Sequence, residues 1–393
     1  MNVAELRADT PGCEHRVHLN NAGAALMPRP VIQAIHDHID LEAKIGGYEA
    51  EADAADAIAE AYEDVARLLG TSADRVAFTE HATGSFVAAL SSIPFERGDV
   101  LLTTRNDYVS NQIQYLSLAH RFGVEVVRAP DGPEGGVDLH AMEGLIHRRR
   151  PRLVSVTHIP TNSGLVQDVA TIGAMCRARD ILYMVDGCQS VGQMPVDVEA
   201  MGCDFFAATT RKYLRGPRGA GFLYVSDRVL DAGLEPLLPD MRAADWIADD
   251  LYQPAPDAKR FESWEFAWAL VLGTGAAVRY ANTIGLDPIR DRVRSLASTL
   301  RERLAEIPGV RVLDRGTELG ATVTVSVAGH VPEDLATALR IRGINTSSQS
   351  RGSAVIDYDD KGVDGALRVS PHYFNDESDL DALVDALTEI VTG

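Results

Sequence analysis

Short apolar segments alternate with longer amphipathic segments through the first part of the chain. The apolar runs are rich in β-branched residues, as buried strands are. They are RVAFT, VLLTT, VEVVRAP, RLVSVTHIP, ILYMVD, FFAATT and GFLYV, all within residues 75–225. Most of the segments between them have the apolar spacing of helices. Strands that alternate with helices predict right-handed βαβ crossovers, and so an α/β fold with a mostly parallel, buried sheet flanked by helices.

Polar residues gather where the predicted strands end. These positions hold Asn106, Asp107, His158, Asn162, Asp186, Gln189 and Lys212. In open α/β sheets, ligands bind outside the carboxyl ends of the strands. We therefore expect a ligand site at this edge of the sheet.

The pattern changes beyond the last of these strands. Residues 234–257 are irregular and contain prolines, which we interpret as an active-site loop or a subunit contact. A long helical region at 266–306 follows, and mixed strands and helices then predict a smaller α+β domain. We divide the chain into an N-terminal segment that contributes to the site (1–30), a large domain (31–260), and a connecting helix with a small C-terminal domain (261–393).

Composition and charge narrow the classes of function. The 393 residues, of which 46% are hydrophobic and 24% charged, have an ordinary globular composition. A net charge of −20 argues against nucleic-acid and membrane partners, because it repels phosphates and anionic lipids. The four cysteines lack CxxC spacing, which argues against a disulfide framework or a metal site. With neither a signal pattern nor an apolar run near the ~20 residues of a membrane span, we expect a cytoplasmic protein.

One lysine is a candidate for covalent chemistry. Only four of the 37 lysines and arginines are lysines, and Lys212 follows a predicted strand just before a Gly/Pro-rich loop. Burial and nearby positive charge make a lysine amine nucleophilic, so that it can form a Schiff base with a carbonyl cofactor. A surface lysine in a turn is the alternative, and this residue alone does not decide between them.

Two further features support a carbonyl cofactor at this site. Asp186 ends an apolar strand, where a pyridinium nitrogen would be a suitable partner for its carboxylate; a helix N-cap is the alternative. Thr83 and Gly84 lie between a strand and a helix, where a hydroxyl and backbone N–H groups can hold a phosphate. The combination with Lys212 is more specific than any one of the three.

Several motifs together resemble one enzyme family. HLNNAGAALMP, TEHATGSF, VDGCQSVG, TTRKYLRGPRGAGFLYV and RVSPHYFN are similar to motifs of the class V, fold type I enzymes that use pyridoxal 5′-phosphate. This branch includes cysteine desulfurases, kynureninase, isopenicillin N epimerase and the carbon–sulfur lyase of ergothioneine biosynthesis. The resemblance covers roughly residues 17 to 390. It implies a large cofactor-binding domain, built on a mostly parallel sheet of about seven strands flanked by helices, and a smaller α+β C-terminal domain.

The resemblance also implies roles for residues around the cofactor. Lys212 would form the Schiff base and move the Cα proton of an amino-acid substrate. Asp186 would pair with the pyridine nitrogen, and Gln189 would bind the phenolic oxygen. The residues expected to hold the phosphate are Thr83, Gly84, Thr209 and Arg211.

Other implied roles concern the substrate and a second subunit. Arg368 would bind the substrate carboxylate, with Asn162 near that carboxylate and the cofactor oxygen and Ala24 also in contact with the substrate. Tyr108 would stack on the cofactor ring, although a shift of one residue would place Val109 there. Trp264, in FESWE, would line the site of a neighbouring subunit, which implies a homodimer with shared active sites.

The absence of one cysteine affects which reaction of this family we expect. Desulfurases of the family carry a nucleophilic cysteine shortly before the carboxylate-binding arginine, and NTSSQSRGSAVIDYDDKGVDGALR contains none. The TTRKYLRGPRG motif resembles ergothioneine-type lyases. We therefore expect a pyridoxal phosphate-dependent carbon–sulfur lyase that acts by β-elimination on an S-conjugated cysteine, and not a persulfide-forming desulfurase. Epimerisation, transamination and cofactor binding without catalysis are the alternatives.

Several residues near these motifs keep two interpretations. The histidines His81, His158 and His372 are either structural or part of the site. Arg215 and Arg218 would either bind an anionic substrate side chain or serve the structure.

Overall fold

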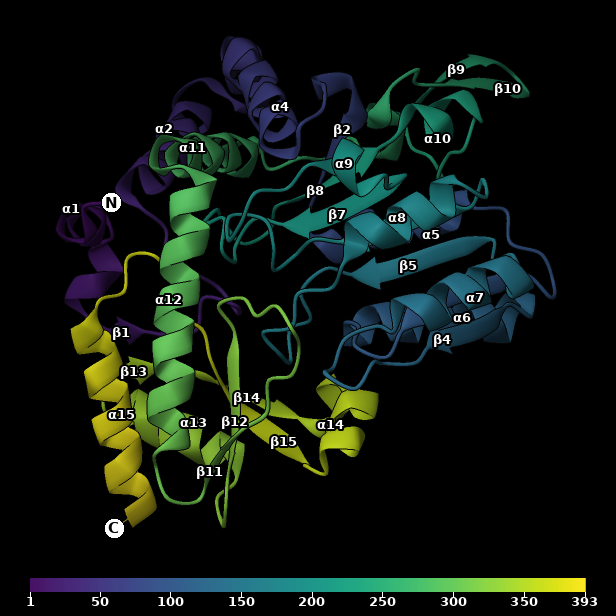
Figure 1. The fold of residues 1–393 in the computed structure, drawn as a ribbon. Helices are drawn as coiled ribbons and strands as arrows, with labels where there is room; N and C mark the ends of the chain where they lie inside the picture. The colour runs from purple at the N-terminus through teal and green to yellow at the C-terminus, as the bar shows by residue number, and fades with distance from the viewer. Residues whose placement is uncertain (393) are drawn as a thin grey trace.

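A seven-stranded sheet forms the centre of the larger part of the molecule (Figure 1). The structure, a computed structural model, describes residues 1–392. The strand order is β2-β8-β7-β6-β5-β3-β4, and β8 alone runs antiparallel to its neighbours in this sheet. The strands are β2 (Val76–Thr79), β3 (Val100–Thr104), β4 (Glu125–Ala129), β5 (Leu153–Thr157), β6 (Leu182–Asp186), β7 (Phe205–Thr209) and β8 (Gly221–Val225). The predicted α/β fold with a mostly parallel sheet is confirmed.

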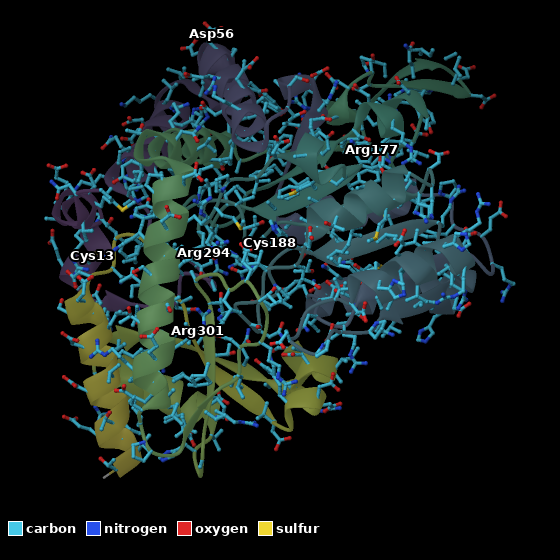
Figure 2. The ribbon with its side chains drawn as sticks, in the orientation of Figure 1. Cys13, Asp56, Arg177, Cys188, Arg294 and Arg301 are labelled. Carbon is cyan, nitrogen blue, oxygen red and sulfur yellow. The ribbon has the colours of Figure 1, made fainter. Side chains whose placement is uncertain are left out.

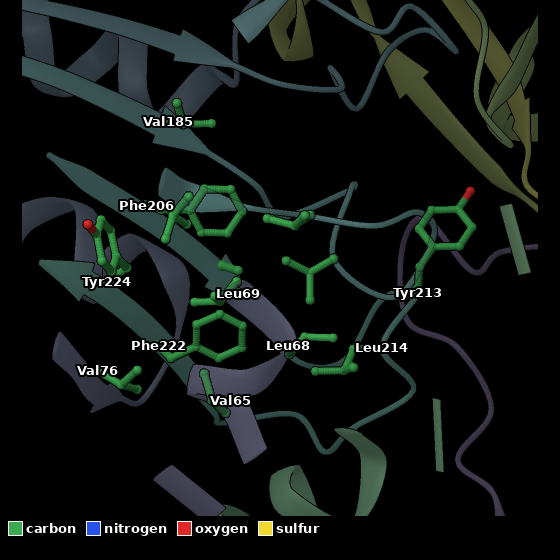
Figure 3. Close-up of a cluster of buried hydrophobic side chains, with 14 of the residues drawn as sticks. Val65, Leu68, Leu69, Val76, Val185, Phe206, Tyr213, Leu214, Phe222 and Tyr224 are labelled. Atoms are coloured by element: carbon green, nitrogen blue, oxygen red, sulfur yellow. The ribbon is translucent and has the colours of Figure 1, made fainter. Parts of the chain in front are cut away.

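The two faces of this sheet bury different side chains because neighbouring residues of a strand point to opposite sides. Phe206 and Phe222 pack on one face with Val65, Leu68 and Leu69 of α4 (Figure 3). On this face lie α2 (Arg29–Ile45), α4 (Ala55–Leu69), α7 (Leu139–Arg149), α8 (Val169–Arg177) and α11 (Trp268–Ile284). The opposite face is covered by α5 (Ala82–Ser92), α6 (Val109–Phe122) and α10 (Asp227–Asp231).

A second, smaller sheet lies in the C-terminal part of the chain. Its order is β11-β12-β15-β14, with all neighbours antiparallel. The elements are β11 (Val310–Val312), β12 (Val323–Val327), α13 (Pro332–Ile341), β13 (Ile344–Asn345), β14 (Ser347–Ser350), α14 (Val355–Lys361), β15 (Gly365–Val369) and α15 (Glu377–Thr392). The short strand β1 (Val17–His18) pairs with β13, which joins the N-terminal segment to this part. The three-part division of the chain stays a prediction.

One helix contributes to both hydrophobic cores. The helical region expected at 266–306 divides at Gly285, whose φ of 92° is readily accessible only to glycine, into α11 and α12 (Leu286–Ala305). The N-terminal half of α12 places Ile289 in the core of the large sheet, and its C-terminal half places Leu300 in the core of the small sheet. The two parts of the chain are therefore packed on a common helix.

Residues 234–257 are less irregular than the sequence indicates. They contain an antiparallel hairpin of β9 (Ala244–Ala248) and β10 (Leu251–Pro254), which the sequence pattern missed because most of its side chains are exposed. The remaining helices are α1 (Val3–Ala8), α3 (Gly47–Asp53) and α9 (Val198–Met201). Within residues 1–392, no helix combines the length and the apolar character needed to cross a membrane.

A buried arginine holds distant segments together. Arg215 is 1% exposed, and its guanidinium donates hydrogen bonds to the Leu26 carbonyl (2.8 Å), the Tyr373 hydroxyl (2.7 Å) and the Thr10 hydroxyl (2.6 Å). Its Cζ atom also lies 4.5 Å from the centre of the Phe374 ring. Of the two interpretations of Arg215, the structural one therefore agrees with its contacts, because protein groups occupy its donors.

We predict that Arg215→Met lowers the free energy of unfolding by about 3 kcal/mol, because it leaves buried oxygens without their donor. Urea denaturation followed by circular dichroism measures this. Arg218→Met is the matched control in the same loop; Arg218 is exposed, so its substitution should change the value by less than about 0.5 kcal/mol. Equal effects of the two substitutions would contradict the structural role.

Candidate active site

A cavity lies at the carboxyl ends of β5, β6 and β7, next to the N-terminus of α5. It contains about 530 Å³ of space that protein atoms do not fill, part of which is open to solvent. Its lining residues are His81, Ala82, Thr83, Tyr108, Asn111, Thr157, Ile159, Thr161, Asp186, Cys188, Gln189, Thr209, Arg211 and Lys212. Seven residues expected at the site from the sequence are among them: Thr83, Tyr108, Asp186, Gln189, Thr209, Arg211 and Lys212. They converge because parallel strands end at one edge of the sheet.

Lys212 lies in the turn after β7 and is buried, with 7% exposure. Among residues 1–392, no group accepts a hydrogen bond from its amine, which lies 5.9 Å from the centre of the Tyr108 ring. Burial lowers the pKa of Lys212; the thiol of Cys188 and the carboxylate of Asp186 counteract this, and Arg211 adds to it. A lower pKa leaves more of the amine neutral and nucleophilic.

Asp186 is the last residue of β6 and is 4% exposed. One carboxylate oxygen accepts a hydrogen bond from the Cys188 backbone N–H (3.0 Å), and the other from the Asn111 side chain (2.9 Å). No helix begins after it, since α9 is capped by Asp197, so the N-cap alternative is not observed. Within residues 1–392, Asp186 makes no ion pair. A buried carboxylate without a cation leaves charge that a protonated ring nitrogen can balance.

Arg368 is connected to the cavity by Thr161, a lining residue to which its guanidinium donates hydrogen bonds. It donates to the Thr161 hydroxyl (2.6 Å) and carbonyl (3.2 Å) and to the Asn20 side chain (3.2 Å). Arg368 is 5% exposed, its Nε atom has no partner, and burial lowers its pKa. Gln189 also donates to Thr161, at 3.2 Å, and its Oε1 atom is buried without a partner. A positive charge that no described carboxylate balances suits an anionic substrate group.

In the turn expected to bind phosphate, the backbone N–H of Gly84 is already used within the protein. His81 caps α5, and its Nδ1 atom accepts a hydrogen bond from the Gly84 backbone N–H at 2.9 Å. Gly84 does not line the cavity, whereas Thr83, Thr209 and Arg211 do. Arg211 also donates to the Gly23 carbonyl. His81 is therefore a site residue whose role the sequence left open, and the phosphate contacts stay predictions.

Other expected residues lie outside the cavity lining. Asn162 donates to the Asp357 carboxylate (2.7 Å) and to Asn106 (3.3 Å), which ties it to α14. Trp264 is 44% exposed on an outer groove described below. Ala24 offers its carbonyl to His18, at 2.9 Å. Their proposed roles with cofactor and substrate stay predictions.

Three residues with an open role, Val109, His158 and His372, do not line the cavity. Val109 does not line the cavity, whereas Tyr108 does. His158 and His372 are buried away from it, and burial lowers the pKa of both. The sequence missed Asn111 and Cys188 as lining residues. Both lie close in sequence to predicted site residues, Asn111 three residues after Tyr108 and Cys188 two after Asp186, and this proximity could have indicated them.

The chain is similar over most of its length to a known protein family and to several known proteins. A model of the class-V aminotransferase family matches residues 17–383. A probable cysteine desulfurase of Methanothermobacter thermautotrophicus is 30% identical over 99% of this chain and 98% of its own. The solved cysteine desulfurase of Thermococcus onnurineus NA1 has a TM-score of 0.91 and 26% identity, and covers 99% of this chain and 98% of its own. Cysteine desulfurase CsdA of Escherichia coli has a TM-score of 0.91 and 25% identity, and covers 100% and 99%.

These findings correct the expected reaction. The relatives and solved structures reported above match this chain over nearly its whole length, and they are named cysteine desulfurases or probable cysteine desulfurases. The prediction of a carbon–sulfur lyase, its alternatives, and the exclusion of a persulfide-forming desulfurase are therefore wrong. The sequence misled because one missing side chain was given more weight than the similarity of the whole site.

The predicted cofactor, pyridoxal 5′-phosphate, is confirmed by the family match. The residues present fit this group. The buried amine of Lys212 suits its aldehyde, the unbalanced carboxylate of Asp186 suits its ring nitrogen, and the cationic side chain of Arg211 suits its phosphate.

We predict that Lys212→Ala prevents covalent attachment of the cofactor, because no other lysine lines the cavity. After borohydride reduction, mass spectrometry of the wild type should show the added mass on the peptide with Lys212. Lys259→Ala, which removes an exposed lysine, should keep the adduct. An adduct that persists in Lys212→Ala would contradict the assignment.

Proposed function

The chain belongs to the class-V aminotransferase family, and from this premise we propose that it is a pyridoxal phosphate-dependent cysteine desulfurase. The observation that carries the proposal is its similarity, over nearly the whole chain, to proteins named cysteine desulfurases. Arg368 gives independent support for an amino-acid substrate, since this buried guanidinium can bind an α-carboxylate through parallel hydrogen bonds.

The proposed reaction assigns a task to each charged group. When bound, the cofactor supplies a ring that withdraws electrons from the substrate Cα atom. Lys212 takes and returns the Cα proton, a role suited to an amine whose pKa is lowered by burial. Asp186 keeps the ring nitrogen protonated, and Arg368 orients the substrate through its carboxylate.

The chain's own thiols are poorly suited to take the sulfur. Cys188 lines the cavity near the middle of the molecule, whereas Cys13 lies in the N-terminal segment (Figure 2). Burial raises the pKa of all four thiols, which disfavours the reactive thiolate. We therefore propose that an external thiol takes the sulfur. An SH group moves from Cβ of cysteine to the acceptor sulfur, and the acceptor's hydrogen replaces it on carbon, which yields alanine and a persulfide.

We predict that the holoenzyme, incubated with L-cysteine and dithiothreitol, forms alanine and sulfide in equal amounts, since this thiol releases sulfide from its persulfide. Amino-acid analysis and a sulfide assay measure both products. Cys188→Ala should retain activity within about threefold, because its thiol is not the acceptor. Pyruvate in place of alanine would contradict desulfuration, and loss of activity in folded Cys188→Ala would contradict the external acceptor.

We also propose that the protein is a homodimer with shared active sites. The outer groove comprises two adjoining hollows that share Glu80 and Phe266; one contains Trp264, and the other contains Leu237 and Leu238. Leu237 and Leu238 are 69% and 86% exposed, which is unfavourable for apolar side chains left in water. His81 and Thr83 line both this groove and the cavity, so a subunit seated on the groove would reach the active site.

We predict that the wild type sediments as a dimer and that Leu238→Asp weakens dimerisation at least tenfold, because it places a charge in the apolar groove. Sedimentation velocity over a concentration series measures this. Ile341→Asp is the matched control: Ile341 is 79% exposed on α13 and does not line the groove. A monomeric wild type would contradict the proposal.

A further inference from the structure

A chain of buried polar groups lies behind Asp186. Asn111, near the start of α6, is 3% exposed, and its side-chain amide donates to Asp186 (2.9 Å) and to Asp107 (3.1 Å). One NH₂ group therefore lies between two buried carboxylates. Asp107 is 5% exposed and does not line the cavity. Neither Asp107 nor Asn111 has a part in the proposed reaction described above.

The two carboxyl oxygens of Asp107 accept five hydrogen bonds in total. One of its oxygens accepts from the Tyr108 backbone N–H (2.7 Å) and the Thr157 hydroxyl (2.6 Å), in addition to Asn111. The other accepts from Thr103 (3.0 Å) and Gln112 (2.9 Å). Burial raises the pKa of Asp107, whereas the hydrogen bonds from Thr157, Gln112 and Asn111 lower it. Burial together with the nearby Asp186 carboxylate outweighs these hydrogen bonds, so the pKa of Asp107 is raised. The five donors fix the orientation of its carboxyl group.

These contacts connect two sides of the cavity. Through the backbone N–H of Tyr108, Asp107 fixes the position from which that ring faces Lys212. Through Asn111, it orients the Asp186 carboxylate and prevents rotation about its terminal torsion. Thr157 pairs with Asp186 in the register between β5 and β6, so the arrangement is anchored in the sheet.

We propose that Asp107 and Asn111 are positioning residues that hold the Asp186 carboxylate and the Tyr108 ring in the orientation needed to bind and protonate the cofactor nitrogen. They act through other residues and not on the substrate. The inference depends on the cofactor and not on the sulfur chemistry, so it stands or falls separately from the cysteine assay.

The test compares Asn111→Leu with Gln114→Leu in the purified holoenzyme. Asn111→Leu keeps the side-chain size but removes the donor. Gln114 is a partly buried amide on the same helix, and its oxygen has no hydrogen-bond partner. Two readouts are measured: the dissociation constant of pyridoxal phosphate, and the ¹⁵N chemical shift of its ring nitrogen after labelling.

For Asn111→Leu we expect about tenfold weaker cofactor binding and a ¹⁵N shift towards the unprotonated ring, because a hydrogen bond to a charged group is lost. Gln114→Leu should match the wild type in both. Asp107→Asn, which keeps the shape but replaces one acceptor oxygen with a donor, should change both readouts in the same direction as Asn111→Leu and decides the question if Asn111→Leu does not fold. Binding within twofold of the wild type and an unchanged ¹⁵N shift in a folded variant would overturn the proposal.

Discussion

The structure depends on burying charges that the chain does not neutralise. An amine, a carboxylate and a guanidinium, those of Lys212, Asp186 and Arg368, are each at most 7% exposed, and none makes an ion pair within residues 1–392. Burial of unpaired charge opposes folding, and it lowers the pKa of both cationic groups. In the proposed reaction, the cofactor and an amino-acid substrate would offer the missing partners: an aldehyde, a protonated ring nitrogen and a carboxylate. The binding energy of those ligands would then compensate a cost built into the fold.

The rest of the molecule provides the rigidity that such a site requires. The parallel strands fix the chain direction at each polar residue, and Gly187 permits the close packing that follows Asp186, since a Cβ atom there would lie 1.9 Å from the Phe206 ring. Arg215 joins the N-terminal segment to the C-terminal part that carries Arg368. Helix α12 packs in both cores. The positions of Lys212 and Arg368 are thus held by contacts of other residues, among them Arg215, whose backbone N–H donates to the Lys212 carbonyl.

Elements with a strong periodic signal were predictable, and those without one were not. The buried strands were found because each is a short apolar run, and Asp186, Gln189 and Lys212 were placed together because such strands end at one edge. The β9–β10 hairpin was missed, since its exposed side chains follow no burial pattern. Asp107 was placed among the polar residues at the strand ends, but Asn111 was not, because its contact with Asp186 joins α6 to β6 and depends on tertiary packing. The tie between Asn162 and Asp357 spans 195 residues of sequence, and no local pattern indicates it.

The error about the reaction shows that two chemical steps place separate demands on a protein. Cleavage of a carbon–sulfur bond requires a base, an electron-withdrawing ring and an oriented substrate, and these belong to the large sheet and Arg368. Receipt of the sulfur requires only one accessible thiolate, which a separate molecule can supply. The serine-containing segment before Arg368 therefore bears on the acceptor and not on the bond that breaks. In the proposed reaction, the charged site determines that sulfur leaves cysteine, and the chain leaves its destination to a thiol outside the fold.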